Sequence, residues 1–172
     1  MQRAIEHVPA GSWPKEQASG SVTLDFDARH RRRIRLGLDA GGHVLLDLPR
    51  AVAMADGDAL ALEGGGWIEV RAAAEPVVEI RCSTPLALAR VAWHLGNRHL
   101  PTEIRDGCLR IRPDHVIEEM LVRLGAELTR VTAAFQPEGG AYGREPNGRG
   151  DGVHHHHHHH HHHHEHGARH DQ

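Results

Sequence analysis

Histidine is the residue type with the clearest chemical potential in this chain, which holds 19 histidines among 172 residues. A neutral imidazole is the commonest protein ligand for metal ions, and a packed core has no use for a long histidine run. The sequence therefore predicts a metal-binding tail at the carboxyl end. Its candidate ligands are His154, His155, His156, His157, His158, His159, His160, His161, His162, His163, His164, His166 and His170.

The alternative interpretation of this run is a purification tag, which would have to be set aside before any reasoning about the fold. The run is longer than a usual tag, and it continues into the segment from Glu165 to Gln172, which resembles neither a linker nor a vector scar. We therefore favour a native tail and leave the tag open.

A second candidate site is the segment from Ala92 to Pro101, which contains two histidines. His94 falls within an expected helix, where a lone histidine is more often packed or solvent-facing than a ligand. His99 falls just past the expected end of that helix, on a short connection. Position therefore favours His99 as the ligand.

Composition and motifs exclude several classes of function. The formal charge of −3 and the pI near 6.7 give no overall attraction to nucleic acid or to an anionic membrane. The arginines of the stretch 31–35 alternate with apolar residues as on the solvent face of a strand, which we favour over a nucleic-acid patch. There is no Gly-rich phosphate loop, G-x-S-x-G or H-E-x-x-H motif, so no enzyme is predicted.

The expected location is the cytoplasm. No basic segment followed by an apolar one opens the chain, and the longest apolar stretches are far shorter than the roughly 18 residues of a spanning helix. Cys82 and Cys108 fall within apparent strands and form no C-x-x-C pair. Buried thiols in a reducing compartment are favoured over metal ligands.

The first half of the chain reads as short strands. Apolar residues alternate with polar ones from Val22 and again around Ile34, which is the period of a strand with one buried face. Glycine-rich turns separate the strands near residues 39–42, 56–57 and 64–66. A small all-β sandwich or barrel is expected.

The second half predicts the element order βαββαβ. Thr84 and Pro85 begin a helix that Gly96 can end, and Asp114 begins one that Gly125 can end. Asp106-Gly107 joins two strands as a hairpin. This order is that of the ferredoxin-like fold, an antiparallel sheet with two helices on one face.

The predicted fold class is therefore α+β, in three parts. Residues 1–74 form the β domain, residues 75–136 form the ferredoxin-like metal-binding domain, and residues 137–172 form a disordered Gly-rich tether with the His-rich tail.

The segment His94-Leu-Gly-Asn-Arg-His-Leu-Pro101 resembles the H-L-G-N-R-H-[LV]-P motif of the UreE family of nickel metallochaperones, which act as urease accessory proteins. As in that family, a hairpin and a D-H-V-[IL] helix start follow, here at Asp114, and the chain ends in histidines. The similarity spans nearly the whole chain. The motif is specific by itself, whereas other nickel proteins also carry a histidine tail.

The resemblance implies that His99 is a metal ligand at a face where two ferredoxin-like domains pair as a homodimer. It also implies a peptide-binding type of N-terminal domain and delivery of Ni(II) to the urease apoprotein together with the accessory GTPase UreG. Some members carry an H-x-H pair before the second helix. Here only His115 of such a pair is present, which puts that peripheral site in doubt.

Two imidazoles from a dimer are an incomplete ligand set, so water or tail histidines must supply further donors, which also eases release. Cu(II) and Zn(II) are expected to compete in vitro, because imidazole sites do not select nickel. Two alternative functions remain open: nickel storage or detoxification through the tail, and a peptide-binding adaptor with incidental metal affinity.

Overall fold

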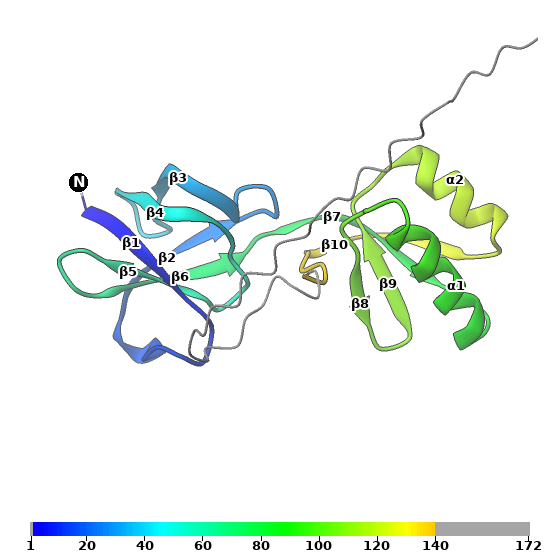
Figure 1. Cartoon of the computed structure of the whole chain (residues 1–172), viewed down its shortest axis with the longest axis horizontal. Helices are drawn as coiled ribbons and strands as arrows, with labels where there is room; N and C mark the ends of the chain where they lie inside the picture. The colour runs from blue at the N-terminus through cyan, green and yellow to red at the C-terminus, as the bar shows by residue number, and fades with distance from the viewer. Residues whose placement is uncertain (1, 140–172) are drawn as a thin grey trace, which may run out of the picture. The chain divides into compact units, whose positions relative to one another are not determined.

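The protein is described here by a computed structural model, which covers residues 2–139. It is a mixed α+β structure, with a strand-rich N-terminal region followed by a second sheet that carries two helices (Figure 1). This confirms the predicted α+β class. The candidate ligands of the tail, from His154 to His170, lie outside the described residues.

The first sheet has six strands in the order β2-β6-β5-β1-β4-β3. It pairs β1 with β4 and β2 with β6 in parallel, and its other neighbours are antiparallel. A short 3-10 helix, η1 (Lys15–Gln17), precedes β2. The strands are β1 (Gln2–Val8), β2 (Ala18–Leu24), β3 (His30–Gly37), β4 (His43–Ala53), β5 (Ala59–Leu62) and β6 (Trp67–Ala72).

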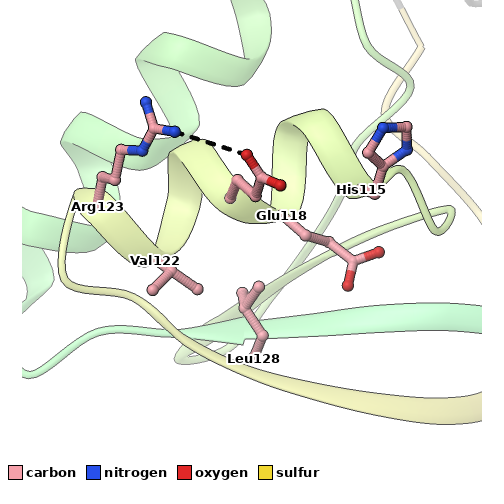
Figure 2. Close-up of a pocket in the computed structure, with 6 residues that line it drawn as sticks. His115, Glu118, Val122, Arg123 and Leu128 are labelled. Carbon is pink, nitrogen blue, oxygen red and sulfur yellow. Dashed lines mark ion pairs between the residues drawn. The ribbon is translucent and has the colours of Figure 1, made fainter.

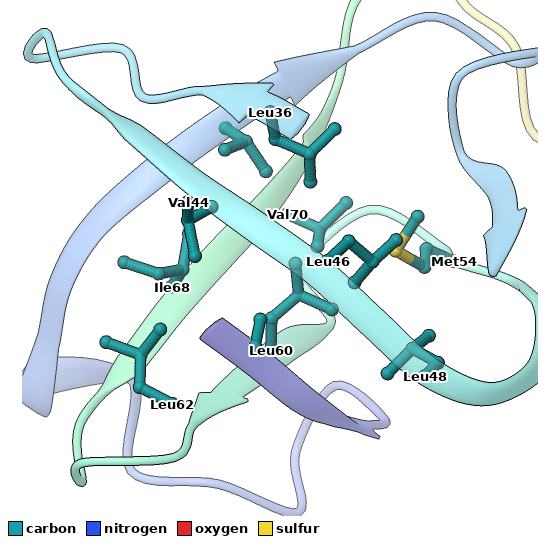
Figure 3. Packing of buried hydrophobic residues seen from close by; sticks show 11 residues of the cluster. Leu36, Val44, Leu46, Leu48, Met54, Leu60, Leu62, Ile68 and Val70 are labelled. Atoms are coloured by element: carbon teal, nitrogen blue, oxygen red, sulfur yellow. The ribbon is translucent and has the colours of Figure 1, made fainter. Parts of the chain in front are cut away.

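The core of this sheet follows from the alternation seen in the sequence. Leu36, Val44, Leu46, Ile68 and Val70 are at most 3% exposed and belong to one apolar cluster (Figure 3). Residues two apart on a strand point to the same face, so alternating apolar residues from several strands meet in one layer. The strands predicted between residues 22 and 70 are therefore present, with their glycine turns in place.

The second sheet is built from the last part of the described chain, in the order β10-β7-β9-β8, and all neighbouring strands are antiparallel. The element order is βαββαβ, as the sequence predicts. The elements are β7 (Ala74–Arg81), α1 (Pro85–Gly96), β8 (Glu103–Arg105), β9 (Cys108–Ile111), α2 (His115–Arg123) and β10 (Glu127–Ala134).

Both helices pack on the same face of this sheet. Val78 and Ile80 of β7 share a core cluster with Val91 and Leu95 of α1 and with Leu121 of α2. Each of these side chains is at most 1% exposed. Buried apolar side chains therefore hold both helices against the sheet.

No helix in residues 2–139 is long and apolar enough to span a membrane.

Candidate functional site

Helix α1 positions the segment that the sequence singles out. Thr84 has extended backbone angles, and its side-chain oxygen accepts a hydrogen bond from Ala87 N at 3.1 Å, so it acts as the N-cap. Pro85 occupies the first turn, where its missing N–H leaves no hydrogen bond unmade. The start of α1 is thus set by local sequence, as predicted.

The end of α1 differs from the prediction. The helix does stop at Gly96, but the residue with a left-handed backbone is His99, with φ of +54°. His99 N donates to Gly96 O at 3.0 Å, and Leu100 N donates to Leu95 O at 3.3 Å, the two bonds of a Schellman turn. Within residues 2–139, His99 is the only residue other than glycine with a positive φ.

A left-handed backbone is unfavourable for a residue with a Cβ atom, by about 1–2 kcal/mol. Such outliers persist where the surrounding structure holds them, and they concentrate at functional sites. The His99 side chain is exposed, and it stands at the carboxyl end of a helix, where the partial negative charge of the helix dipole favours a cation. The local geometry therefore suits a solvent-facing metal ligand.

The surroundings of His94 are those of a partly packed side chain. Its ring lies edge-on to Trp93, with centroids 5.0 Å apart, and it is half-buried. Its carbonyl oxygen accepts a hydrogen bond from Arg98 Nη1 at 3.0 Å. Nothing in this arrangement directs the His94 ring toward a ligand position, so a structural role fits it better than metal binding.

His115 is the first residue of α2, and its side chain is exposed. It lines a shallow groove together with Glu118, Glu119, Val122, Arg123 and Leu128 (Figure 2). The acids of this groove already have cationic partners, because Glu118 pairs with Arg130 at 3.0 Å and Glu119 pairs with Arg123 at 3.5 Å. Within the described range, no three metal-ligating side chains come together at His115 or elsewhere.

The two cysteines belong to no group of metal-ligating side chains within residues 2–139. Cys108 is buried in β9, and Cys82 is partly buried just after β7. Burial and the nearby Glu127 raise the pKa of the Cys82 thiol, which disfavours the thiolate that a metal would need. Both observations agree with the prediction of structural thiols.

Sequence reasoning missed the outer face of α1. Leu86 and Trp93 are 62% and 64% exposed, although both are large and apolar. They are seven residues apart and so lie on the same side of the helix, opposite the packed stripe. Their separation of seven residues, two turns of a helix, was the signal in the sequence that could have found this face.

Two protein-family models match this chain, one in each half. The family model described as "UreE urease accessory protein, N-terminal domain" matches residues 1–73, and the one described as "UreE urease accessory protein, C-terminal domain" matches residues 75–167. Together the two models match nearly the whole chain, and the C-terminal one includes His94, His99 and His115.

Individual proteins named UreE are also similar to this chain over most of its length. The urease accessory protein UreE of Bradyrhizobium sp. (strain ORS 278) is 53% identical over 150 residues, which are 87% of this chain and 71% of that protein. The UreE of Bradyrhizobium sp. (strain BTAi1 / ATCC BAA-1182) is 55% identical over 154 residues, 90% of this chain and 74% of the relative. The UreE of Beijerinckia indica is 51% identical over 142 residues, 83% of this chain and 82% of the relative. The chain therefore belongs to the UreE family of urease accessory proteins.

Proposed function

We propose that this urease accessory protein is a nickel metallochaperone that binds Ni(II) through His99 and delivers it for assembly of the urease metallocentre. The observation that carries the proposal is the exposed imidazole of His99, held in a left-handed turn at the carboxyl end of α1. The turn fixes the backbone of the ligand before any metal arrives, so little ordering is required on binding.

One imidazole is a poor metal site, and we infer that two copies of the chain share it. Nickel accepts four to six donors, and a twofold axis would bring a second His99 to the same ion. The exposed Leu86 and Trp93 on the outer face of α1 support self-association through this helix, because burying large apolar side chains favours dimers. The βαββαβ order and the strand order β10-β7-β9-β8 support a ferredoxin-like assignment for the domain that would pair.

The tail histidines are proposed as exchangeable ligands of the same ion. Glu138 N donates to Thr102 O at 2.9 Å, so the chain beyond β10 returns to the connection between α1 and β8, which contains His99. Glu138 and His154 are only 16 positions apart in the sequence. This short separation along the sequence supports a high effective concentration of the tail imidazoles at the ion. A ligand can then leave the ion while another arrives.

The proposed setting is the cytoplasm, with UreG and the urease apoprotein as partners and with no covalent chemistry performed by this chain. Cu(II) and Zn(II) should compete with Ni(II) in vitro, because imidazole donors favour copper and do not exclude zinc. The storage alternative receives no support from the relatives, which are named urease accessory proteins.

Nickel titration by calorimetry tests this function in the full-length chain with its tail histidines replaced by glutamine. We expect one nickel per two chains, lost in the His99→Ala variant. His43→Ala is the matched control, because His43 is an exposed histidine at the start of β4. Alanine carries a left-handed backbone cost similar to that of histidine, so His99→Ala should change stability little. Equal nickel binding by the tail-substituted parent chain and its His99→Ala variant would refute the proposal.

A further inference from the structure

The two helices of the second sheet end in the same hydrogen-bonded turn. At the end of α2, Gly125 N donates to Val122 O at 2.9 Å and Ala126 N donates to Leu121 O at 3.1 Å. Gly125 has φ of +80°. The end of α1 repeats these bonds with His99 in the position of the glycine. Glycine is the usual residue there because it has no Cβ to clash, so α2 is an internal reference for what the turn itself prefers.

The turn decides which side chain enters the core. Leu88, Val91 and Leu95 lie on the packed side of α1. If the helix continued, residue 99 would come four residues after Leu95 and would face the same core. The left-handed residue ends the helix instead, and Leu100 packs against the core cluster while His99 is exposed. The direction of the imidazole therefore depends on the turn and on the leucine that anchors it.

We propose that Leu100 is the positioning residue for His99, and that the chain accepts an unfavourable backbone at His99 in order to present the imidazole to the metal. Leu100 acts through its burial, which holds the turn closed and the His99 backbone in one direction. The choice of nickel as probe rests on the proposed function, whereas the backbone cost at His99 is independent of it.

The first experiment measures urea unfolding of the full-length chain without metal. His99→Gly should shift the unfolding equilibrium about fivefold toward the folded state, because glycine adopts the left-handed backbone without penalty. Gly125→Ala should shift it by a similar factor toward the unfolded state. If His99→Gly has no effect or destabilises the fold, His99 bears no backbone cost and the proposal is overturned.

The second experiment measures nickel affinity in the full-length chain whose tail histidines are replaced by glutamine. Leu100→Ala should weaken nickel binding about tenfold, while the conservative Leu100→Met should stay within about twofold because it refills the same space. Leu128→Ala is the matched control, because Leu128 of β10 is partly buried against the same cluster. It should lose comparable stability and keep its nickel affinity.

The outcomes of the two experiments separate the two proposals. If Leu100→Ala keeps wild-type nickel affinity, or if Leu128→Ala weakens it equally, Leu100 does not position His99. If the parent chain binds no nickel through His99, the proposed function fails and the role of Leu100 fails with it. The unfolding result for His99→Gly then still decides whether the turn imposes a backbone cost.

Discussion

His99 and His115 are two exposed histidines of the same sheet-and-helix region, and they stand at opposite ends of helices. His99 follows the carboxyl end of α1, whereas His115 is the first residue of α2. A helix carries a partial negative charge at its carboxyl end and a partial positive charge at its amino end, and each favours an opposite charge by about 0.3–1 kcal/mol. The same physics therefore favours a cation at His99 and opposes one at His115.

The side chains around the two histidines also differ. The carboxylate of Asp114 accepts hydrogen bonds from Val116 N at 3.0 Å and Ile117 N at 3.1 Å, so it is occupied as the cap of α2. Near His99, the cationic side chain of Arg98 donates to the carbonyl oxygen of His94, so its charge opposes part of the effect of helix polarity at that end. Residue type alone does not distinguish a ligand from a neighbour; helix polarity and the occupation of nearby groups do.

The largest expected effect is the loss of urease activation in the full-length His99→Ala variant. In the proposed dimer the substitution removes both shared imidazoles at once, whereas the tail offers many replaceable ones. Nickel-dependent activation at limiting nickel should fall at least about tenfold, because the loss even of residues that only support metal ligands costs about 10–100-fold in metal affinity or activity. Total nickel stoichiometry should change only slightly. Normal activation by His99→Ala, together with loss of activation on deletion of the tail, would reverse the comparison and favour a tail-centred mechanism.

Acid should release nickel without unfolding the protein. Protons compete with metal for imidazole, so most nickel should leave between about pH 7.5 and pH 5.5. Burial alone would raise the pKa of Asp58, but hydrogen bonds from His7, Ala55 N and Ala10 N outweigh burial and lower that pKa. A lowered folded pKa gives stability that is present above the unfolded value of about 3.9 and is lost as the pH falls through the folded pKa. Circular dichroism should therefore stay native at pH 5.5, and unfolding there would contradict this separation.

Much of the second sheet could be predicted because its signals are local. The caps Thr84 and Asp114 and the Asp106-Gly107 hairpin each act through neighbouring backbone groups, and the structure has them where the sequence places them. Strand β1 was not predicted, because only Ala4 among its seven residues is buried and no alternation is visible. Its position depends on pairing with β4 and β5, which lie far away in sequence.

The position of His99 after the helix could be predicted from the sequence, whereas its backbone conformation could not. The spacing of the motif places His99 after the helix, as found. Glycine is the residue expected in a left-handed turn, so the sequence suggested Gly96 as the end signal, and the structure gives that conformation to His99 instead. Leu100 packs against the core cluster directly after His99, and such packing is a property of the folded molecule that local sequence signals do not report.

Removing the cap beside His115 should have a moderate effect on stability alone. Asp114→Ala leaves two backbone N–H groups of α2 without their partner and should cost about 1 kcal/mol of unfolding free energy in urea. Asp114→Asn is the matched control, because asparagine caps nearly as well, and it should stay within about 0.5 kcal/mol. Nickel affinity should be unchanged in both variants. A weaker nickel affinity in Asp114→Asn would instead place this carboxylate at a metal site.

The smallest expected effect is that of His115→Ala on nickel binding, measured in a chain truncated after Ala141. The removed segment contributes no periodic apolar residues, so the truncated chain should stay folded and dimeric, and the tail no longer hides the two histidines under comparison. His115 faces the positive end of α2, and neighbouring Glu118 and Glu119 already pair with arginines. Removing its imidazole should therefore change the dissociation constant for nickel by less than about twofold, which corresponds to about 0.4 kcal/mol of binding free energy. Calorimetry on the truncated chain decides the matter. A tenfold loss of nickel affinity in His115→Ala would show that the amino terminus of α2 does hold a cation. His115 and His99 would then both be metal ligands.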